Sequence, residues 1–302
     1  MTTKKLKLGM IGLDTSHCTA FAKLLNDSAN EYHVPGGTVM YGYPGGSPDF
    51  DMSHTRVEGF TATLRDEYGI AMLGSPEEVA ERSDAILLTS VDGRVHLEQF
   101  RKIVGYGKPI FIDKPFALTT AEASAMVQSA QEHGVPIMSA SSARFGQELL
   151  DVLEAEAKDD IIGADCYGPM ELKPTQPGLY WYGIHSAEML YRILGRGCVQ
   201  VTAVTNDQYE LVVGVWKDGR VGTIRGNRRG NKTFGGLIHG IKESVFVNTS
   251  KHPKPKYASL LEAVMSMFQT GQPPIDPQET IEIIRFLEAA NESRATGATV
   301  RL

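Results

Sequence analysis

Cysteine is scarce in this chain. Cys18, Cys166 and Cys198 are the three cysteines in 302 residues, and they lie far apart without a Cys-x-x-Cys pair. Disulfide frameworks and cysteine-type zinc sites need more of these residues at closer spacing. We therefore expect free thiols and a reducing compartment.

Long apolar runs and an excess of positive charge are also lacking. No run approaches the roughly 20 residues of a membrane span, and residues 1–8 hold no signal-peptide core. The net charge is −6 and the pI is near 5.8, which argues against nucleic acid as a partner. The densest basic stretch, residues 225–232, contains two glycines and is typical of a turn with solvated cations. We expect a cytoplasmic protein that binds neither nucleic acid nor membrane.

The chain is rich in apolar residues, and they recur in a regular order. With 302 residues and 42% hydrophobic content, it can form a large core and two domains. Short apolar runs alternate with helical patterns through the first half; this predicts strands over residues 6–13, 38–43, 85–91, 109–113 and 135–139 and helices over residues 16–25, 75–82, 96–104 and 120–133. Such alternation predicts a parallel sheet covered on both faces.

One segment breaks that order. Residues 32–59 are rich in glycine and proline. A long loop of this kind inside a compact domain is either functional or a plain surface excursion, and the sequence leaves both open.

After Phe145 the order changes. A helix is expected over residues 148–157, then strands over residues 199–205, 209–216, 220–225 and 244–247, and two closing helices over residues 259–268 and 277–294. Lys217-Asp218-Gly219 is a hairpin signal. The predicted fold class is α/β. A Rossmann-type, doubly wound parallel sheet (residues 1–143) precedes an α+β domain with a mainly antiparallel open sheet (residues 144–302).

The first strand runs into a turn with an altered glycine pattern. A dinucleotide-binding fold places the pyrophosphate at the N-terminus of the helix that follows this turn. Gly12 stands where the first glycine of the fingerprint belongs, but Asp14 and His17 replace the second and third. A carboxylate ~4 Å from a phosphate charge is repelled by a few kcal/mol, unless Asp14 or Thr15 caps the helix instead. The candidate cofactor contacts in the turn are Gly12, Leu13, Asp14, Thr15, Ser16 and His17.

The second predicted strand ends at Tyr43-Pro44 without the carboxylate that NAD binders usually place on the ribose. Its absence would permit NADP, with Ser47 or Arg56 near a 2′-phosphate. It would equally suit a chain that binds no dinucleotide.

The segment from Lys108 to Pro115 carries a family resemblance. It resembles the Gly-Lys-x-Val-x-x-Glu-Lys-Pro segment of the Gfo/Idh/MocA-like oxidoreductase family, with Asp113 in place of the glutamate. Other similar segments follow the family in order over nearly the whole chain: His96, Arg144-Phe145, Gly183 to Leu190, and the tail from Thr270 to Val300.

The resemblance implies hydride transfer between NAD or NADP and a sugar or polyol. It implies that Lys114 lies at a strand end, holds the substrate hydroxyl and is positioned by Asp113. His185 would be the general base, because imidazole titrates near neutral pH. Tyr182 is a further catalytic candidate in the aromatic run 180–182, which would otherwise be core packing. Ser90, Asp92 and His96 would join the cofactor contacts, and the open sheet face would form a dimer or tetramer.

Two other classes of function stay open. One is a non-oxidising relative that uses its pocket for ligand binding or regulation. The other is a metal-assisted lyase or hydrolase, since several metal-binding residue types lie near expected strand ends: Asp14, His17, Asp51, His54, Asp92 and His96. No tight ligand spacing such as His-x-x-x-His accompanies them, so no metal site is predicted.

Overall fold

The chain forms two compact units. The computed structural model describes residues 5–155 and 160–302. The first unit runs to Ala117 and adds Ala121–Ala140 and Leu260–Pro277; the second holds Leu118–Thr120, Ser141–Ser259 and Gln278–Leu302. The sequence placed residues 260–277 in the second domain. In the structure they return to the first unit, where Met265 and Gln269 lie against the backbone of Gly36.

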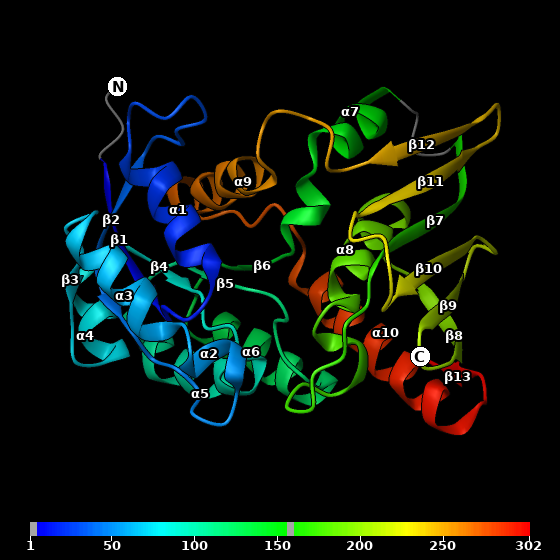
Figure 1. The fold of residues 1–302 in the computed structure, drawn as a ribbon, viewed down its shortest axis with the longest axis horizontal. Coiled ribbons are helices and arrows are strands. Elements are labelled where there is room, and N and C mark those ends of the chain that lie inside the picture. Colours follow the sequence, from blue (N-terminus) through cyan, green and yellow to red (C-terminus); the bar gives the residue numbers. More distant parts are fainter. Residues whose placement is uncertain (1–4, 156–159) are drawn as a thin grey trace. The chain divides into compact units, whose positions relative to one another are not determined.

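The first unit is built on a six-stranded sheet in the order β3-β2-β1-β4-β5-β6, and every pair is parallel (Figure 1). The strands are β1 (Leu6–Ile11), β2 (Gly37–Tyr43), β3 (Ala71–Met72), β4 (Ala85–Leu88), β5 (Ile110–Ile112) and β6 (Ile137–Ser139). The order reverses between β1 and β4. Ligands of open α/β sheets bind at such a switch point, outside the carboxyl ends of the strands.

The helices of this unit flank the sheet. They are α1 (Ser16–Asn26), α2 (Asp51–His54), α3 (Val57–Asp66), α4 (Pro76–Arg82), α5 (His96–Ile103), α6 (Thr120–Glu132) and α9 (Lys256–Thr270). Helix α1 packs on α3, and α4 packs on α5. Because β-α-β crossovers are right-handed, α1 and α3 cover one face and α4, α5 and α6 cover the other. The doubly wound prediction is confirmed.

The sequence reading missed structure in the glycine- and proline-rich region. Helices α2 and α3 both begin within the predicted loop, and the short strand β3 follows them. One of the predicted helices, α4, has clear start signals in the sequence. Ser75 caps α4 through its hydroxyl, and Pro76 occupies the first helical turn.

The second unit holds a seven-stranded sheet in the order β12-β11-β7-β10-β9-β8-β13. Its strands are β7 (Ile161–Pro169), β8 (Cys198–Thr205), β9 (Tyr209–Trp216), β10 (Val221–Asn227), β11 (Gly235–Gly240), β12 (Ser244–Asn248) and β13 (Val300–Arg301). Only β7 and β10 pair in parallel, so the mainly antiparallel sheet is confirmed. The predicted hairpin joins β9 to β10. Strands β7, β11 and β13 were missed.

Helices cover one face of this sheet. Helix α8 (Gly183–Leu194) packs on β7 and β10, and Phe286 of α10 (Pro277–Thr296) lies beside the backbone of β9 at Gly214. Helix α7 covers Gln147–Ala155 and packs on β12; the predicted continuation to Ala157 lies outside the described residues.

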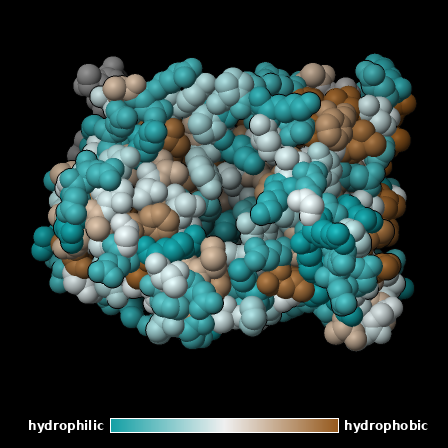
Figure 2. Space-filling view, in the orientation of Figure 1, coloured by the Kyte–Doolittle hydropathy of each residue, from teal (hydrophilic) through white to brown (hydrophobic). Residues whose placement is uncertain are grey.

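The other face of the second sheet is open and partly apolar. Val204, Val221 and Phe246 expose 46–65% of their surface there. Most of the surface visible in Figure 2 is hydrophilic, with brown patches in the area of β11 and β12. None of the described helices is long and apolar enough to cross a bilayer.

Phe100 tests the packing of the first unit. Its ring on α5 is fully buried, so Phe100→Ala should lower the free energy of unfolding by about 3–5 kcal/mol. Tyr106, which follows α5 in the same unit, is 41% exposed, and Tyr106→Ala should cost less than about 1 kcal/mol. Urea unfolding followed by circular dichroism measures both. Equal losses would contradict the assigned burial.

Candidate functional site

The turn between β1 and α1 needs glycine at its first position. Gly12 has a φ of +86°, and a Cβ there would lie 2.2 Å from Ser90 Oγ. Both the backbone conformation and the space therefore exclude other residues. Thr15 then caps α1, with its hydroxyl accepting the N–H of His17.

The Asp14 carboxylate points into the protein. It is 1% exposed, accepts the Ser53 hydroxyl at 2.6 Å and accepts the Val91 N–H at 2.9 Å. Arg56 binds the Asp14 carbonyl at 3.0 Å. Burial raises the pKa of Asp14, although the bonds from Ser53 and Val91 oppose the rise. Of the two predicted helix caps, Thr15 is the one that caps α1. The Asp14 carboxylate instead links the turn to Ser53 and Val91 within the first unit.

The segment after β2 (residues 44–56) crosses the ends of β1 and β4. Its Pro44 carbonyl accepts the Leu13 N–H at 2.8 Å, and Gly45 lies close to the backbone of Gly12. Farther along, Asp49 forms a two-point ion pair with Arg94, just after β4, at 2.7 Å. The segment is therefore held against the carboxyl ends of β1 and β4 by these contacts.

His17, Asp113 and Lys114 meet at the end of β5. His17 Nδ1 lies 2.7 Å from Asp113 Oδ2, and Asp113 is 1% exposed. Burial alone would raise the pKa of Asp113, but the charges on His17 and Lys114 and the bond from His17 prevail and lower it. The carboxylate therefore stays ionised beside Lys114, which is itself 6% exposed.

His96 and Asp92, predicted as cofactor contacts, hold loops together. The His96 side chain is fully buried, with Nε2 2.8 Å from the Ser90 carbonyl and Nδ1 2.9 Å from the Pro115 carbonyl. Asp92 is also fully buried and pairs with Arg94 at 2.7 Å. Both side chains support the loops at the ends of β4 and β5, on which Ser90 and Lys114 lie.

The residues of this crevice fit a dinucleotide pyrophosphate. Helix α1 begins at the exposed Ser16, has no acidic residue in its first turn and presents its N-terminus near the switch point. The feature that threatened phosphate binding, a carboxylate at position 14, is directed to Ser53 and Val91 instead. Thr15, Ser16 and Gly12 would hold the pyrophosphate, with Lys114 toward the nicotinamide end.

In the second unit, His185 lies at the start of α8 among aromatic rings. Its Nδ1 is 2.6 Å from Ser141 Oγ, and its ring centroid is 5.6 Å from that of Tyr182 and 5.2 Å from that of Phe234. A base role for Nε2 requires Nδ1–H to donate to Ser141. Ser141 and Phe234 were not predicted, because nothing local in the sequence links them to His185.

A buried charge cluster supports the same helix. Glu188 lies one turn after His185 and accepts Arg144 at 3.2 Å, and Arg144 also binds Glu279. Burial raises the pKa of Glu188 to about 7, with Glu279 adding to the rise and Arg144 opposing it. The cluster joins the segment around Ser141 to α8 and α10, and thereby fixes the position of His185.

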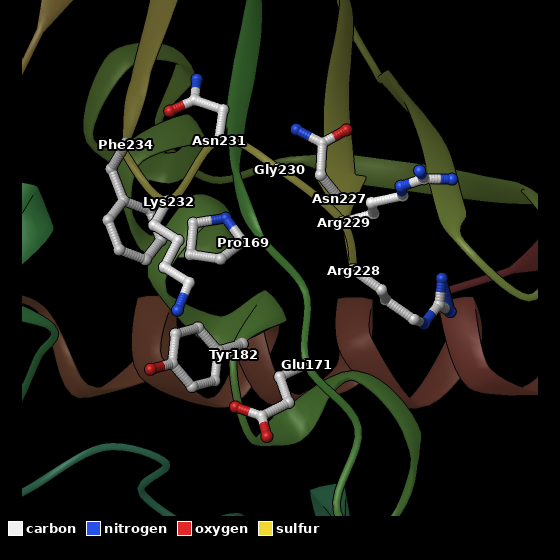
Figure 3. Close-up of a pocket in the computed structure, with 10 residues that line it drawn as sticks. All are labelled: Pro169, Glu171, Tyr182, Asn227, Arg228, Arg229, Gly230, Asn231, Lys232 and Phe234. Atoms are coloured by element: carbon white, nitrogen blue, oxygen red, sulfur yellow. The ribbon is translucent and has the colours of Figure 1, made fainter.

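The aromatic run divides between the core and the site. Tyr180 and Trp181 are 2% and 5% exposed, so they are core residues. Tyr182 is half-buried and lines a cavity of about 390 Å³ together with Phe234 (Figure 3). Lys232 and Glu171 also line it. Ligand pockets span roughly 300–1,000 Å³, so the cavity is large enough for a small molecule.

The metal alternative has no ligand cluster in the part of the chain that the structure describes. No group of three His, Cys, Asp or Glu side chains gathers there. Among the six candidates, Asp14, His17 and Asp92 are engaged by Ser53, Asp113 and Arg94.

Comparisons with known proteins agree with this arrangement. Residues 50–141 match the profile described as an oxidoreductase family with an NAD-binding Rossmann fold. The chain has no match among curated protein sequences. Among solved structures, it resembles the myo-inositol 2-dehydrogenase of Lactobacillus plantarum, with 16% identity, a TM-score of 0.79 and coverage of 99% of this chain and 100% of that chain.

Two structures from Lactobacillus casei are similar as well. The scyllo-inositol dehydrogenase shares 16% identity, with a TM-score of 0.79 and coverage of 100% of this chain and 99% of that chain. The myo-inositol dehydrogenase in complex with NAD(H) and myo-inositol shares 14% identity, with a TM-score of 0.76 and coverage of 99% and 97%. At these identities the likeness establishes the fold.

The chain is thus an α/β protein with a Rossmann-type unit and a mixed-sheet unit. Residues 50–141 match the profile of the family that the sequence resemblance indicated, and the fold of the chain is similar to that of the solved dehydrogenase structures.

The buried Asp14 carboxylate gives a pH-dependent prediction. The pKa of Asp14 is raised in the folded state above its ordinary value of 3.8. The free energy of unfolding of the wild type should therefore fall relative to that of Asp14→Asn as the pH rises through and above 3.8. Asn can still accept the Val91 N–H. Denaturant unfolding from about pH 3 to about pH 7 would measure the difference.

Asp218 serves as a control, because its pKa is shifted in the opposite direction to that of Asp14. Its carboxylate is bonded to Arg220, which lowers its pKa, so Asp218→Asn should lose stability relative to the wild type as the pH rises at the acid end. Curves for Asp14→Asn and the wild type that stay parallel would contradict the buried tether.

Proposed function

We propose that this protein is an NAD- or NADP-dependent oxidoreductase that moves hydride between a nicotinamide and a hydroxyl-bearing carbon of a sugar or polyol. The observation that carries the proposal is the Asp113–Lys114 pair at the carboxyl end of β5, in a family with an NAD-binding Rossmann fold. A buried carboxylate whose pKa is lowered by His17 and Lys114 lies there beside a nearly buried lysine.

Lys114 and Asp113 act on the substrate hydroxyl. When bound, the nicotinamide accepts or returns the hydride. The Lys114 ammonium donates to the hydroxyl oxygen and stabilises the negative charge that develops on it. Asp113 positions Lys114 and is itself held by His17 at 2.7 Å.

His185 removes the hydroxyl proton in the oxidative direction. Its Nε2 serves as the base while Nδ1–H donates to Ser141 Oγ, which fixes the ring orientation. Tyr182, whose ring packs against the imidazole, contributes a hydroxyl at the cavity. Glu188 and Arg144 position the helix that carries the base.

A screen of sugars and polyols with NAD⁺ and NADP⁺, followed by nicotinamide absorbance, tests these roles. With an active substrate, His185→Ala and Lys114→Met should each lower kcat by about 10²–10⁴. Ser141→Ala should lower it less and shift the pH profile, because it removes only the hydrogen bond that orients the base.

The controls use residues away from both crevices. His133 and Lys102 are exposed, and His133→Ala and Lys102→Met should leave kcat unchanged. Full activity in His185→Ala, or no turnover of any sugar or polyol by a chain that binds the dinucleotide, would contradict the proposal.

We also propose that a second copy of this chain covers the open face of the second sheet. That face exposes Val204 and Phe246, at 65% and 59%. Light scattering should give a mass that is a multiple of 33.0 kDa, and Val204→Asp should reduce it to one copy. A one-copy mass for the unsubstituted protein would remove the proposal.

A further inference from the structure

The cavity beside His185 carries an excess of positive charge. Arg228, Arg229 and Lys232 line it, against the single acidic side chain of Glu171, in a chain whose net charge is −6. The sequence had suggested that this basic stretch is a solvated turn. The structure instead gathers it around a cavity.

The pairing of these charges leaves cations unmatched. Glu171 is bonded to Lys173 at 2.7 Å, and Arg228 is bonded to the buried Glu210. Within residues 5–155 and 160–302, Arg229 and Lys232 form no ion pair. Of these two, Lys232 extends toward Tyr182, whereas Arg229 extends away from it (Figure 3). An anion beside Tyr182 would therefore meet the Lys232 ammonium, which has no competing carboxylate partner among the described residues.

The cavity adjoins the proposed base. Tyr182 and Phe234 line it, and the rings of both pack against His185, at 5.6 and 5.2 Å between centroids. In Figure 3 the Lys232 side chain extends toward Tyr182 and Glu171. The Lys256 ammonium lies 5.4 Å from the centroid of Phe234 and adds a further cation near the rings. The cavity and the imidazole thus share two aromatic neighbours, Tyr182 and Phe234.

The side-chain chemistry favours an anionic group over further hydroxyls. Lysine and arginine donate hydrogen bonds and accept none, whereas a hydroxyl is usually matched by groups that also accept. A carboxylate or a phosphate satisfies such donors fully and gains a charge-assisted bond.

We propose that the substrate is an anionic carbohydrate or polyol, whose carboxylate or phosphate is held by Lys232 while a hydroxyl faces His185. The proposal rests on the proposed function, since it names the substrate class for that site. It does not require the dinucleotide, because every group that it uses lies in the second unit.

Calorimetry on the full chain without dinucleotide tests it with matched compounds. The panel pairs D-glucose with D-glucuronate and D-glucose 6-phosphate, and myo-inositol with its monophosphate. At least one anionic compound should bind at least about tenfold more tightly than its neutral parent, which is ~1.4 kcal/mol. Whether the carboxylate or the phosphate arm responds identifies the anionic group.

Variants separate the cavity from general charge effects. Lys232→Gln should remove most of the preference for the anion, and Lys232→Arg should retain it. Arg229→Gln should weaken the preference less, because its side chain extends away from Tyr182 (Figure 3). Lys242→Gln, an exposed lysine between β11 and β12, should change nothing. Circular dichroism confirms that each variant is folded.

Three results would overturn the proposal. An absence of preference for any anionic compound overturns it, as does a preference that survives Lys232→Gln or is lost equally in Lys242→Gln. Titration of the same samples with dinucleotides reports separately on the proposed function. An anion preference without dinucleotide binding would retain the anion site and reject the redox role.

Discussion

The inward tether of the Asp14 carboxylate is the interaction on which the first unit depends. A carboxylate at the second fingerprint position would otherwise lie near the pyrophosphate and repel it. Bonds from Ser53 and Val91 direct it into the protein instead and join three segments at one point: the β1–α1 turn, helix α2 and the end of β4. Burial of this carboxylate is unfavourable and raises its pKa. It also keeps the carboxylate away from the N-terminus of α1.

The second unit uses buried charge differently. Arg144 is shared by Glu188 and Glu279 and holds the start of the unit against two helices, so that Ser141 meets His185. Around that imidazole the rings of Tyr182 and Phe234 form one wall of the cavity, and the loop after β10 supplies cations. A buried charge network thus fixes the position of His185, while the more exposed loop after β10 carries the cations that line the cavity.

The sequence predicted those strands and turns whose signal lies within a few neighbouring residues. Buried apolar runs predicted β1, β4 and β5, and the turn at residues 217–219 predicted a hairpin. Strands β7 and β11 were missed because their glycines weaken both the apolar alternation and the strand propensity. Residues 260–277 were placed in the wrong unit, since no periodicity tells a helix which sheet it will cover.

The site could be predicted only in part. Motif resemblance pointed to Asp113, Lys114 and His185. It could not predict their contacts, because His17 lies 96 residues from Asp113 and Ser141 lies 44 residues from His185 in the sequence. The sequence left open whether Asp14 lies near the phosphate or caps the helix, and its actual partner, Ser53, could not be predicted because it lies in a segment expected to be a loop. Such contacts follow from tertiary packing and leave no local signal.

The central claim is that this altered turn still accepts a dinucleotide. The most direct measurement is calorimetric titration of the protein, freed of nucleotide, with NAD⁺, NADH, NADP⁺ and NADPH. The account predicts that at least one binds with a Kd on the order of micromolar, about 8 kcal/mol of binding free energy. Binding of none of the four would contradict it.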